Sequence, residues 1–376
     1  MSRPALLTIH ETALAQNLQQ VRDRVGHASI WAVCKARGYG LGLDSCLRGL
    51  AKADGLAVLE LTEAQALRDG GWSGPVLLLE GAFSQSEIRD ALELDCDLVV
   101  HQVDQLGWLQ SHQSLLASQT SRLWMKFNTG MHRLGFAATT SSQRMALLEP
   151  VAALRGLVPA NRRGWMTHFA NADRSDGIES PMSHWQALMQ VISPQAGECQ
   201  SLANSAAVLL HPKAHADWVR PGIMLYGGSP APRPLNAPVW TLEAAATLSS
   251  RLIAVQTVPA GERIGYGGRY QASASMRIGV VAMGYADGYM RQAPDGTPVL
   301  VDGVRCPLVG QVSMDMITVD LSACPQANVG SPVTLWGRGL SIDEVAQCCG
   351  TNAYELLTGV TFRVARRLEP HLVDED

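Results

Sequence analysis

The sequence lacks the features of a membrane-spanning, secreted or nucleic-acid-binding protein. It has no apolar run of about 18 residues, so we expect no transmembrane helix. Its eight cysteines include no CxxC pair, which gives a structural zinc site no support, and residues 1–18 show no basic start followed by an apolar stretch. The net charge of −4 provides no basic field for nucleic acid or anionic lipid. We therefore expect a cytoplasmic protein with free thiols, no metal site and a small-molecule partner.

The length and the pattern of apolar segments predict two domains. The 376 residues exceed the roughly 250–300 at which a single core stops growing. A short strand (5–10) and a helix (11–24) come first. After residue 235 the sequence pattern changes to β-prone runs separated by turns that contain Gly, Pro and Asp. We expect domains at 1–235 and 236–376, the second mostly β. Its expected strands are 242–258, 276–283, 298–304, 309–320 and 332–336, followed by a helix at 341–349 and a closing strand near 360–365.

The first domain repeats a unit of apolar strand, polar break and amphipathic helix, as in the helices expected at 62–68 and 85–94. Such alternation gives parallel strands joined by right-handed crossovers. Eight units over ~200 residues predict an α/β fold with an N-terminal (β/α)8 barrel, whose chemistry lies at the C-terminal ends of its strands. The expected barrel strands are 30–35, 55–60, 76–80, 96–101, 123–128, 164–168, 199–203 and 218–220.

The stretch 30–42, IWAVCKARGYGLG, places a lysine where the first of these strands ends. Partial desolvation there would lower the pKa of Lys35 and make its amine a usable nucleophile. On position alone a solvated surface lysine is the commoner case. The glycines only weakly indicate a dinucleotide site, because Leu43 stands where a third glycine would fall, and no phosphate-binding G-x-x-x-x-G-K-[ST] occurs.

Other chemically capable residues also fall at the ends of expected strands. They are Lys126, His168, Asn204 and Arg220, with Arg133 in the loop after strand 123–128. Each alone is commonly structural, but together they indicate an active site. The loops 204–207 and 220–223 have the small residues that let backbone N–H groups approach a phosphate. Ser205 could equally be an ordinary helix N-cap.

A reactive lysine, a phosphate cradle and the nearby Tyr39 together suggest pyridoxal phosphate. At this point the sequence resembles the alanine racemases, pyridoxal-phosphate enzymes of fold type III, along essentially its whole length. The shared motifs are AVCKARGYGLG, KFNTGMHRLGF, THFANAD, LANSAA, VRPGIMLYG, GYGGRY, GYADGY and QVSMDM.

The resemblance implies roles for residues of the cofactor site. Lys35 matches the lysine that holds the cofactor as a Schiff base and serves as one acid/base, and Tyr266 matches the second base. Arg220 matches the partner of the pyridine nitrogen. Residues matching phosphate contacts or the lining of the cofactor are Tyr39, Ser205, Gly222, Ile223, Tyr354, Asn204 and His168.

The same resemblance implies how substrate is held. Arg133 and Met314 match contacts to the substrate carboxylate, and Lys126 matches a lysine that is often carbamylated and then braces Arg133. Tyr285 and Asp315 match the entrance and its surroundings. The implied enzyme is a homodimer with shared active sites that interconverts L-alanine and D-alanine by a two-base mechanism, for cell-wall supply or alanine catabolism.

The chain departs from the family pattern near the lysine, with Arg37, Gly38 and Leu41, and has Asn128 in place of a frequent aspartate. Arg37 adds a charge beside the cofactor strand that could alter rate or substrate range. The alternatives are a broad-specificity racemase and a related barrel-type decarboxylase, although decarboxylases lack the GYGG tyrosine and the SMDM stretch. A non-catalytic cofactor carrier would need only the barrel.

Overall fold

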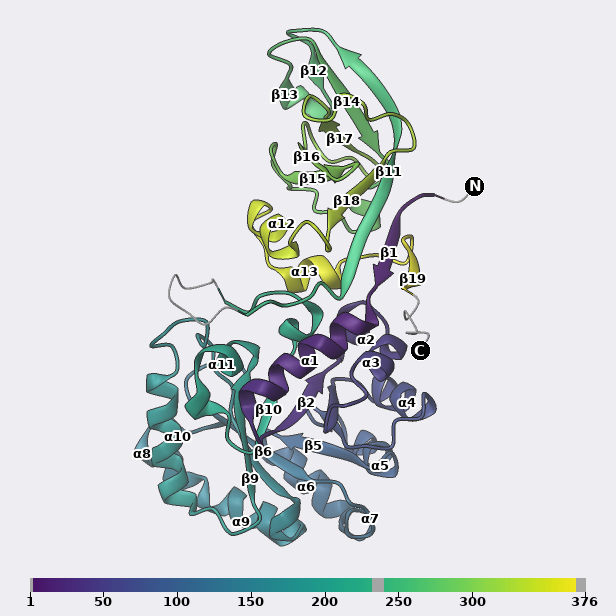
Figure 1. Ribbon diagram of the computed structural model, residues 1–376. Coiled ribbons are helices and arrows are strands. Elements are labelled where there is room, and N and C mark those ends of the chain that lie inside the picture. Colours follow the sequence, from purple (N-terminus) through teal and green to yellow (C-terminus); the bar gives the residue numbers. More distant parts are fainter. Residues whose placement is uncertain (1–2, 232–239, 370–376) are drawn as a thin grey trace.

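A computed structural model describes residues 3–231 and 240–369, and shows a barrel beneath a second, β-rich domain (Figure 1). The barrel closes through eight parallel strands in the order β5-β4-β3-β2-β10-β9-β8-β6, with β5 pairing β6, which confirms the expected fold. A ninth strand of two residues, β7 (Phe136–Ala137), pairs with the end of β6. The barrel strands are β2 (Ser29–Val33), β3 (Gly55–Val58), β4 (Val76–Leu78), β5 (Cys96–Val100), β6 (Leu123–Asn128), β8 (Arg163–Met166), β9 (Cys199–Asn204) and β10 (Trp218–Arg220).

Helices surround the barrel, and most of them bury an apolar stripe against it. In α5 (Gln85–Glu93) the stripe is Ile88, Ala91 and Leu92, and the Ser84 hydroxyl caps the helix by accepting from the backbone N–H of Glu87. The other barrel helices are α1 (Glu11–Val25), α3 (Leu43–Gly49), α4 (Leu61–Asp69), α6 (Val103–Ser111), α7 (Gln113–Ser118), α8 (Ser141–Ala146), α9 (Leu148–Leu157), α10 (Glu179–Ile192) and α11 (Ser205–Leu210). The segment labelled α2 (Lys35–Tyr39) is a tight turn with left-handed backbone angles.

Three tryptophans fill part of the barrel interior, and two of them leave room only for glycine on the neighbouring strands. Trp31 stacks on Trp218 with ring centroids 4.5 Å apart, and Trp124 meets both rings edge-on. Trp31 lies opposite Gly55 on the neighbouring strand, and Trp124 lies opposite Gly164. A Cβ at Gly164 would come within 2.1 Å of the Trp124 ring. These strand positions therefore admit only a residue without a side chain.

The second domain is built around one long strand, β11 (Ala246–Val258), with antiparallel neighbours. Its other strands are β12 (Arg263–Ile264), β13 (Tyr270–Gln271), β14 (Met276–Val281), β15 (Pro298–Val301), β16 (Val304–Pro307), β17 (Ile317–Asp320), β18 (Pro332–Trp336) and β19 (Ala365–Leu368), with helices α12 (Ile342–Cys348) and α13 (Ala353–Thr358). Two expectations were wrong. The expected strand 309–320 is a strand only over its last four residues, since Val309 and Val312 are buried in a loop rather than paired along a ladder. The closing strand is Ala365–Leu368, after the expected 360–365, because residues 359–364 form the connection that packs against other loops.

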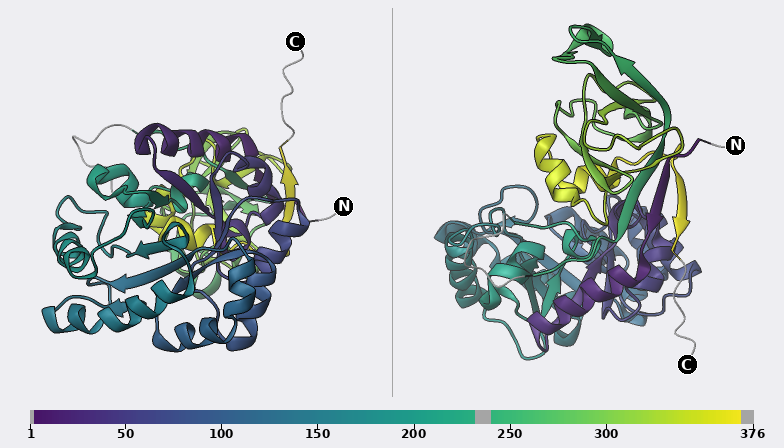
Figure 2. Two further views of the ribbon diagram at one scale, coloured as in Figure 1. Left: turned by 90° about the horizontal axis from the view of Figure 1, so that it is seen from below. Right: turned by 45° about the horizontal axis from the view of Figure 1, so that its top comes forward.

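The N-terminal strand joins the second domain rather than the barrel. β1 (Leu6–Ile9) pairs antiparallel with β11 and parallel with β19, and Figure 2 shows β1 and β19 side by side, in purple and yellow. The chain then enters the barrel through α1. The expected boundary between residues 235 and 236 lies outside the described residues, so that division stays a prediction.

The eight cysteines are all free thiols. Across the described ranges, 3–231 and 240–369, no helix combines the length and apolarity needed to cross a membrane.

Replacing Gly164 by Ala tests the packing of the barrel interior. We expect Gly164→Ala to lower the free energy of unfolding by about 1–3 kcal/mol, since the added Cβ overpacks a rigid ring. Gly107→Ala is the matched control, because Gly107 lies in α6 with open space around it and alanine favours a helix by roughly 0.5–1 kcal/mol. Urea denaturation measures both; equal stabilities of the two variants would contradict this account.

Candidate functional site

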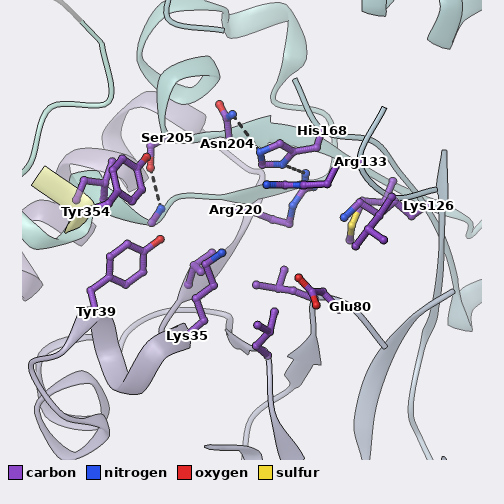
Figure 3. A pocket seen from close by; sticks show the side chains of 17 residues that line it. Lys35, Tyr39, Glu80, Lys126, Arg133, His168, Asn204, Ser205, Arg220 and Tyr354 are labelled. Atoms are coloured by element: carbon purple, nitrogen blue, oxygen red, sulfur yellow. Dashed lines mark hydrogen bonds between the residues drawn. The ribbon is translucent and has the colours of Figure 1, made fainter. Parts of the chain in front are cut away.

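A cavity of about 380 Å³ opens at the C-terminal ends of the barrel strands (Figure 3). This volume lies within the roughly 300–1,000 Å³ typical of small-molecule sites. The structure brings most of the residues expected from the sequence together in its wall: Lys35, Tyr39, Lys126, Arg133, His168, Asn204, Ser205, Arg220, Gly222, Ile223 and Tyr354. Strand ends far apart in the sequence therefore converge on one space.

The cavity also contains residues that the sequence interpretation missed. The most important is Glu80, whose side chain lies in the same wall as Lys35 and Lys126 (Figure 3). Glu80 ended one of the expected strands, so the criterion that selected Lys35 would have selected it too. The other missed residues are apolar: Val33, Leu59, Leu79, Leu134 and Met166.

The backbone after Lys35 makes a left-handed turn, which the sequence did not predict. Residues 36–39 have φ between 53° and 65° in four consecutive positions, and only Gly38 among them lacks a Cβ. The turn reverses the chain in a few residues and leaves Lys35 at its start and Tyr39 at its end, both facing the cavity. A non-glycine residue in this conformation costs roughly 1–2 kcal/mol, so neighbouring groups must hold the turn in place.

Contacts from three elements supply that support. The Glu63 carboxylate of α4 accepts from the backbone N–H of Arg37 at 2.7 Å and from that of Leu59 at 3.0 Å. A Cβ at Gly38 would lie 2.5 Å from the Cys46 sulfur, and a Cβ at Gly40 would lie 2.7 Å from the carbonyl oxygen of Leu357. The glycines thus allow α3 and the second domain to pack directly against the turn.

Arg37 points away from the cavity. Its guanidinium lies over the ring of Phe362, with the carbon centre 5.4 Å from the ring centroid, and Arg366 lies 5.7 Å from the same ring. Cation–π contacts of this kind contribute about 0.5–1 kcal/mol at exposed sites. The departure from the family pattern at position 37 therefore adds a contact between the domains, and its charge is not part of the cavity wall.

One end of the cavity is suited to an anion. The Ser205 hydroxyl oxygen accepts from the backbone N–H of Gly222 at 2.8 Å, so the loops after β9 and β10 are fixed to each other. Asn204, rather than Ser205, caps α11 by accepting from the N–H of Ala207. A Cβ at Gly222 would meet the Tyr39 hydroxyl at 2.3 Å, so this hydroxyl lies directly over the glycine. The Ser205 proton is left available as a donor.

The opposite end is formed by a buried guanidinium. Arg220 donates to the backbone carbonyl of Thr167 at 2.6 Å, to that of Leu202, and to the Ser201 hydroxyl. Burial lowers the pKa of Arg220 to about 9, which still leaves the group charged at neutral pH. His168 stands beside it, and burial followed by the charge of Arg220 lowers the pKa of His168 well below its ordinary value. The histidine is therefore neutral.

Burial and crowding by like charges also act on the two lysines. Burial, then the charge of Arg133, lowers the pKa of Lys35, while Glu80 acts in the opposite direction. Burial, then Arg220, lowers the pKa of Lys126 to about 8. Both amines thus have a larger neutral fraction near pH 7 than a surface lysine, and a neutral amine is what a nucleophile or base requires.

Four expected residues do not line this cavity: Tyr266, Tyr285, Met314 and Asp315. All four belong to the second domain. Tyr266 follows β12, at the end of that domain far from the barrel (Figure 1), and its side chain is 74% exposed. Within one chain, Tyr266 and Lys35 therefore do not share a site.

Family models and full-length relatives all match this chain to one protein family. Residues 9–230 match the alanine racemase N-terminal domain and residues 245–368 match the alanine racemase C-terminal domain. The alanine racemase of Paraburkholderia phytofirmans is 47% identical over 98% of this chain and 100% of its own length. That of Ralstonia nicotianae is 46% identical over 98% of this chain and 96% of its own.

Solved structures agree. An alanine racemase from Acinetobacter baumannii superposes with a TM-score of 0.89 at 34% identity, covering 98% of this chain and 100% of its own. A biosynthetic alanine racemase from Pseudomonas aeruginosa superposes with a TM-score of 0.87 at 40% identity and the same coverage. The chain belongs to the alanine racemase family.

Proposed function

We propose that this chain interconverts L-alanine and D-alanine, using pyridoxal 5′-phosphate held on Lys35 and a second base, Tyr266, from a second copy of the chain. The observation that carries the proposal is the cavity itself, which holds an amine of lowered pKa between an anion cradle and a buried guanidinium. The matches to both racemase domains disfavour the decarboxylase and broad-specificity alternatives. Cell-wall supply and alanine catabolism both use this reaction, and a reducing cytoplasm suits the free thiols.

The cavity fits the cofactor at three points. The cradle of Ser205, Gly222 and Tyr39 would hold the phosphate, because its glycine admits the tyrosine hydroxyl and its serine proton is free to donate. Lys35 would bind the aldehyde carbon. Arg220 would hold the pyridine end, where a guanidinium that stays charged does not give up a proton.

Racemisation requires a proton to leave one face of the α-carbon and return on the other, so two acid/base groups must flank it. Bound pyridoxal phosphate supplies an electron sink for the charge left at that carbon. Once the substrate amine has replaced Lys35 on the cofactor, the freed Lys35 amine would take the proton on one face, because burial and Arg133 favour its neutral form. Arg133, beside Lys35 in the cavity wall, orients substrate by its carboxylate through bidentate hydrogen bonds.

For the second face we assign the base to Tyr266, which lies in the second domain and matches the family's second base. Among the described residues of the cavity wall, Tyr39 is excluded as a base because burial raises its pKa far above neutrality. Tyr266, Tyr285 and Met314 instead lie exposed on the second domain. Exposed tyrosines and methionines are typical of interface residues. A two-fold dimer would bring this surface of each copy to the cavity of the other.

Reduction with borohydride tests the attachment of the cofactor. We expect the purified protein to be yellow, and borohydride to fix the cofactor on Lys35, as read by mass spectrometry of the labelled peptide. Lys35→Ala should carry no label. Lys52→Ala, which removes an exposed lysine of the same domain, is the control and should label normally. A label on any other lysine would contradict the assignment of Lys35 as the attachment point of the cofactor.

Complementation tests the shared site. Lys35→Ala and Tyr266→Phe should each be inactive alone, because each lacks one base. After equal mixing with subunit exchange, half of the dimers are mixed and half of their sites have both bases, so about a quarter of wild-type D-alanine formation should return. Differently tagged copies verify the exchange by pull-down. A mixture that exchanges and stays inactive would show that both bases come from one chain.

A further inference from the structure

A buried carboxylate in the second domain joins three separate segments of the chain. Asp287, in the GYADG loop, has no exposed side-chain surface. Its oxygens accept from Arg3 Nη2 at 2.7 Å, from Arg3 Nε at 3.3 Å, and from the backbone N–H of Gly284 at 2.9 Å. Arg363 Nε lies 3.5 Å away. A buried carboxylate needs such partners, so the loop cannot shift without exposing or unpairing it.

The GYADG loop in turn packs against the loop that carries Met314. The backbone N–H of Tyr285 donates to the carbonyl of Ser313 at 3.1 Å, and that of Ala286 donates to the carbonyl of Met314 at 3.0 Å. A Cβ at Gly284 would lie 2.3 Å from the Met314 carbonyl oxygen. Tyr285 and Met314 therefore move as one unit.

The same two arginines also hold this second loop. Arg3 donates to the backbone carbonyl of Asp315, and Arg363 Nη2 contacts the Asp315 carboxylate at 2.7 Å. Arg3 precedes β1, while Arg363 precedes β19, the strand paired with β1. We call Arg3, Asp287, Asp315 and Arg363 the Asp287 cluster. It ties the pair of loops to the segments just before the paired strands β1 and β19.

The Tyr266 turn has an anchor of its own. Arg269 Nη2 contacts Asp295 at 3.0 Å and donates to the carbonyl of Gly310 at 2.6 Å, and the same Asp295 oxygen accepts from the N–H of Gly310 at 2.7 Å. The second base and the loops of Tyr285 and Met314 are thus fixed by different ion pairs.

We infer that Arg3 and Arg363 are positioning residues for racemisation, which through Asp287 and Asp315 hold Tyr285 and Met314 where the substrate enters and binds. The inference rests on the proposed function, because these two side chains reach a cavity only in a dimer. The cluster touches neither the cofactor cavity nor the Tyr266 turn. Its loss therefore weakens substrate binding more than it slows proton transfer.

The test compares the holoenzyme with Arg363→Gln, Arg3→Gln and the double variant. We expect the KM for L-alanine to rise roughly tenfold in the double variant with kcat within about threefold, since a small misplacement of binding groups weakens substrate binding while both bases stay in place. The absorbance of bound cofactor should be unchanged. Arg363→Lys keeps a charge near both carboxylates and should recover most of the affinity.

Arg305→Gln is the matched control, because Arg305 pairs with Glu344 on the surface of the same domain, away from both loops. It should leave KM unchanged. A wild-type KM in the double variant, or equal losses in kcat for all arginine variants with KM unchanged, would overturn the inference. If the double variant folds poorly, the KM of the single variant Arg3→Gln still tests the inference. In that variant Asp287 keeps its contacts with Arg363 and with the backbone N–H of Gly284. A wild-type enzyme that forms no D-alanine would instead refute the proposed function.

Discussion

The arrangement of this protein depends on confining several positive charges in one partly desolvated cavity. Lys35, Lys126, Arg133 and Arg220 all line it, and Glu80 is the one carboxylate among its described lining residues. Burial and mutual repulsion penalise this state, as the lowered pKa values of both lysines show. Anions that enter relieve the penalty and stabilise the folded chain by mass action. In the proposed function, a phosphate at one end and a carboxylate near Arg133 would meet this requirement, so the charges that would bind the ligands also lower the pKa of Lys35.

Holding the cations in place requires a backbone that is itself strained. The left-handed turn at 36–39 is supported by the Glu63 carboxylate, by Cys46 beneath Gly38 and by the Leu357 carbonyl beside Gly40. The last of these comes from the second domain, so the geometry around Lys35 depends on how the two domains pack. Arg37 strengthens the same contact through Phe362. The strain persists because several independent contacts determine it.

The sequence predicted the barrel and most of the cavity because both follow from local pattern. Strand ends converge in a parallel barrel, so their positions indicate that Lys35, Lys126 and Arg220 meet in one site. Glu80 also ends an expected strand, although the predicted site did not include it. The left-handed turn could not be read in this way, since Ala36, Arg37 and Tyr39 have no preference for it and the tertiary contacts impose it. Likewise, Val309 and Val312 in the run 309–320 are buried without lying in a strand, because burial of an apolar side chain does not by itself make a strand. The role of Tyr266 came from family resemblance, because an exposed tyrosine in a glycine turn carries no local signal.

The second domain contributes to the cofactor cavity of its own chain at one end and carries Tyr266 far from that cavity at the other. Within a chain, α13 rests on the turn after Lys35, and its Tyr354 lies near Tyr39 with ring centroids 5.9 Å apart at the phosphate end of the cavity. The rest of the same domain carries Tyr266 far from that cavity (Figure 1). In our proposal, one chain therefore contains the residues that would hold the cofactor, whereas the second base, Tyr266, would come from a partner copy. In the proposed dimer, cofactor retention would therefore depend on the packing between the two domains of one chain. Turnover would depend in addition on association of the two copies, because that association would place acid/base groups on both faces of the substrate.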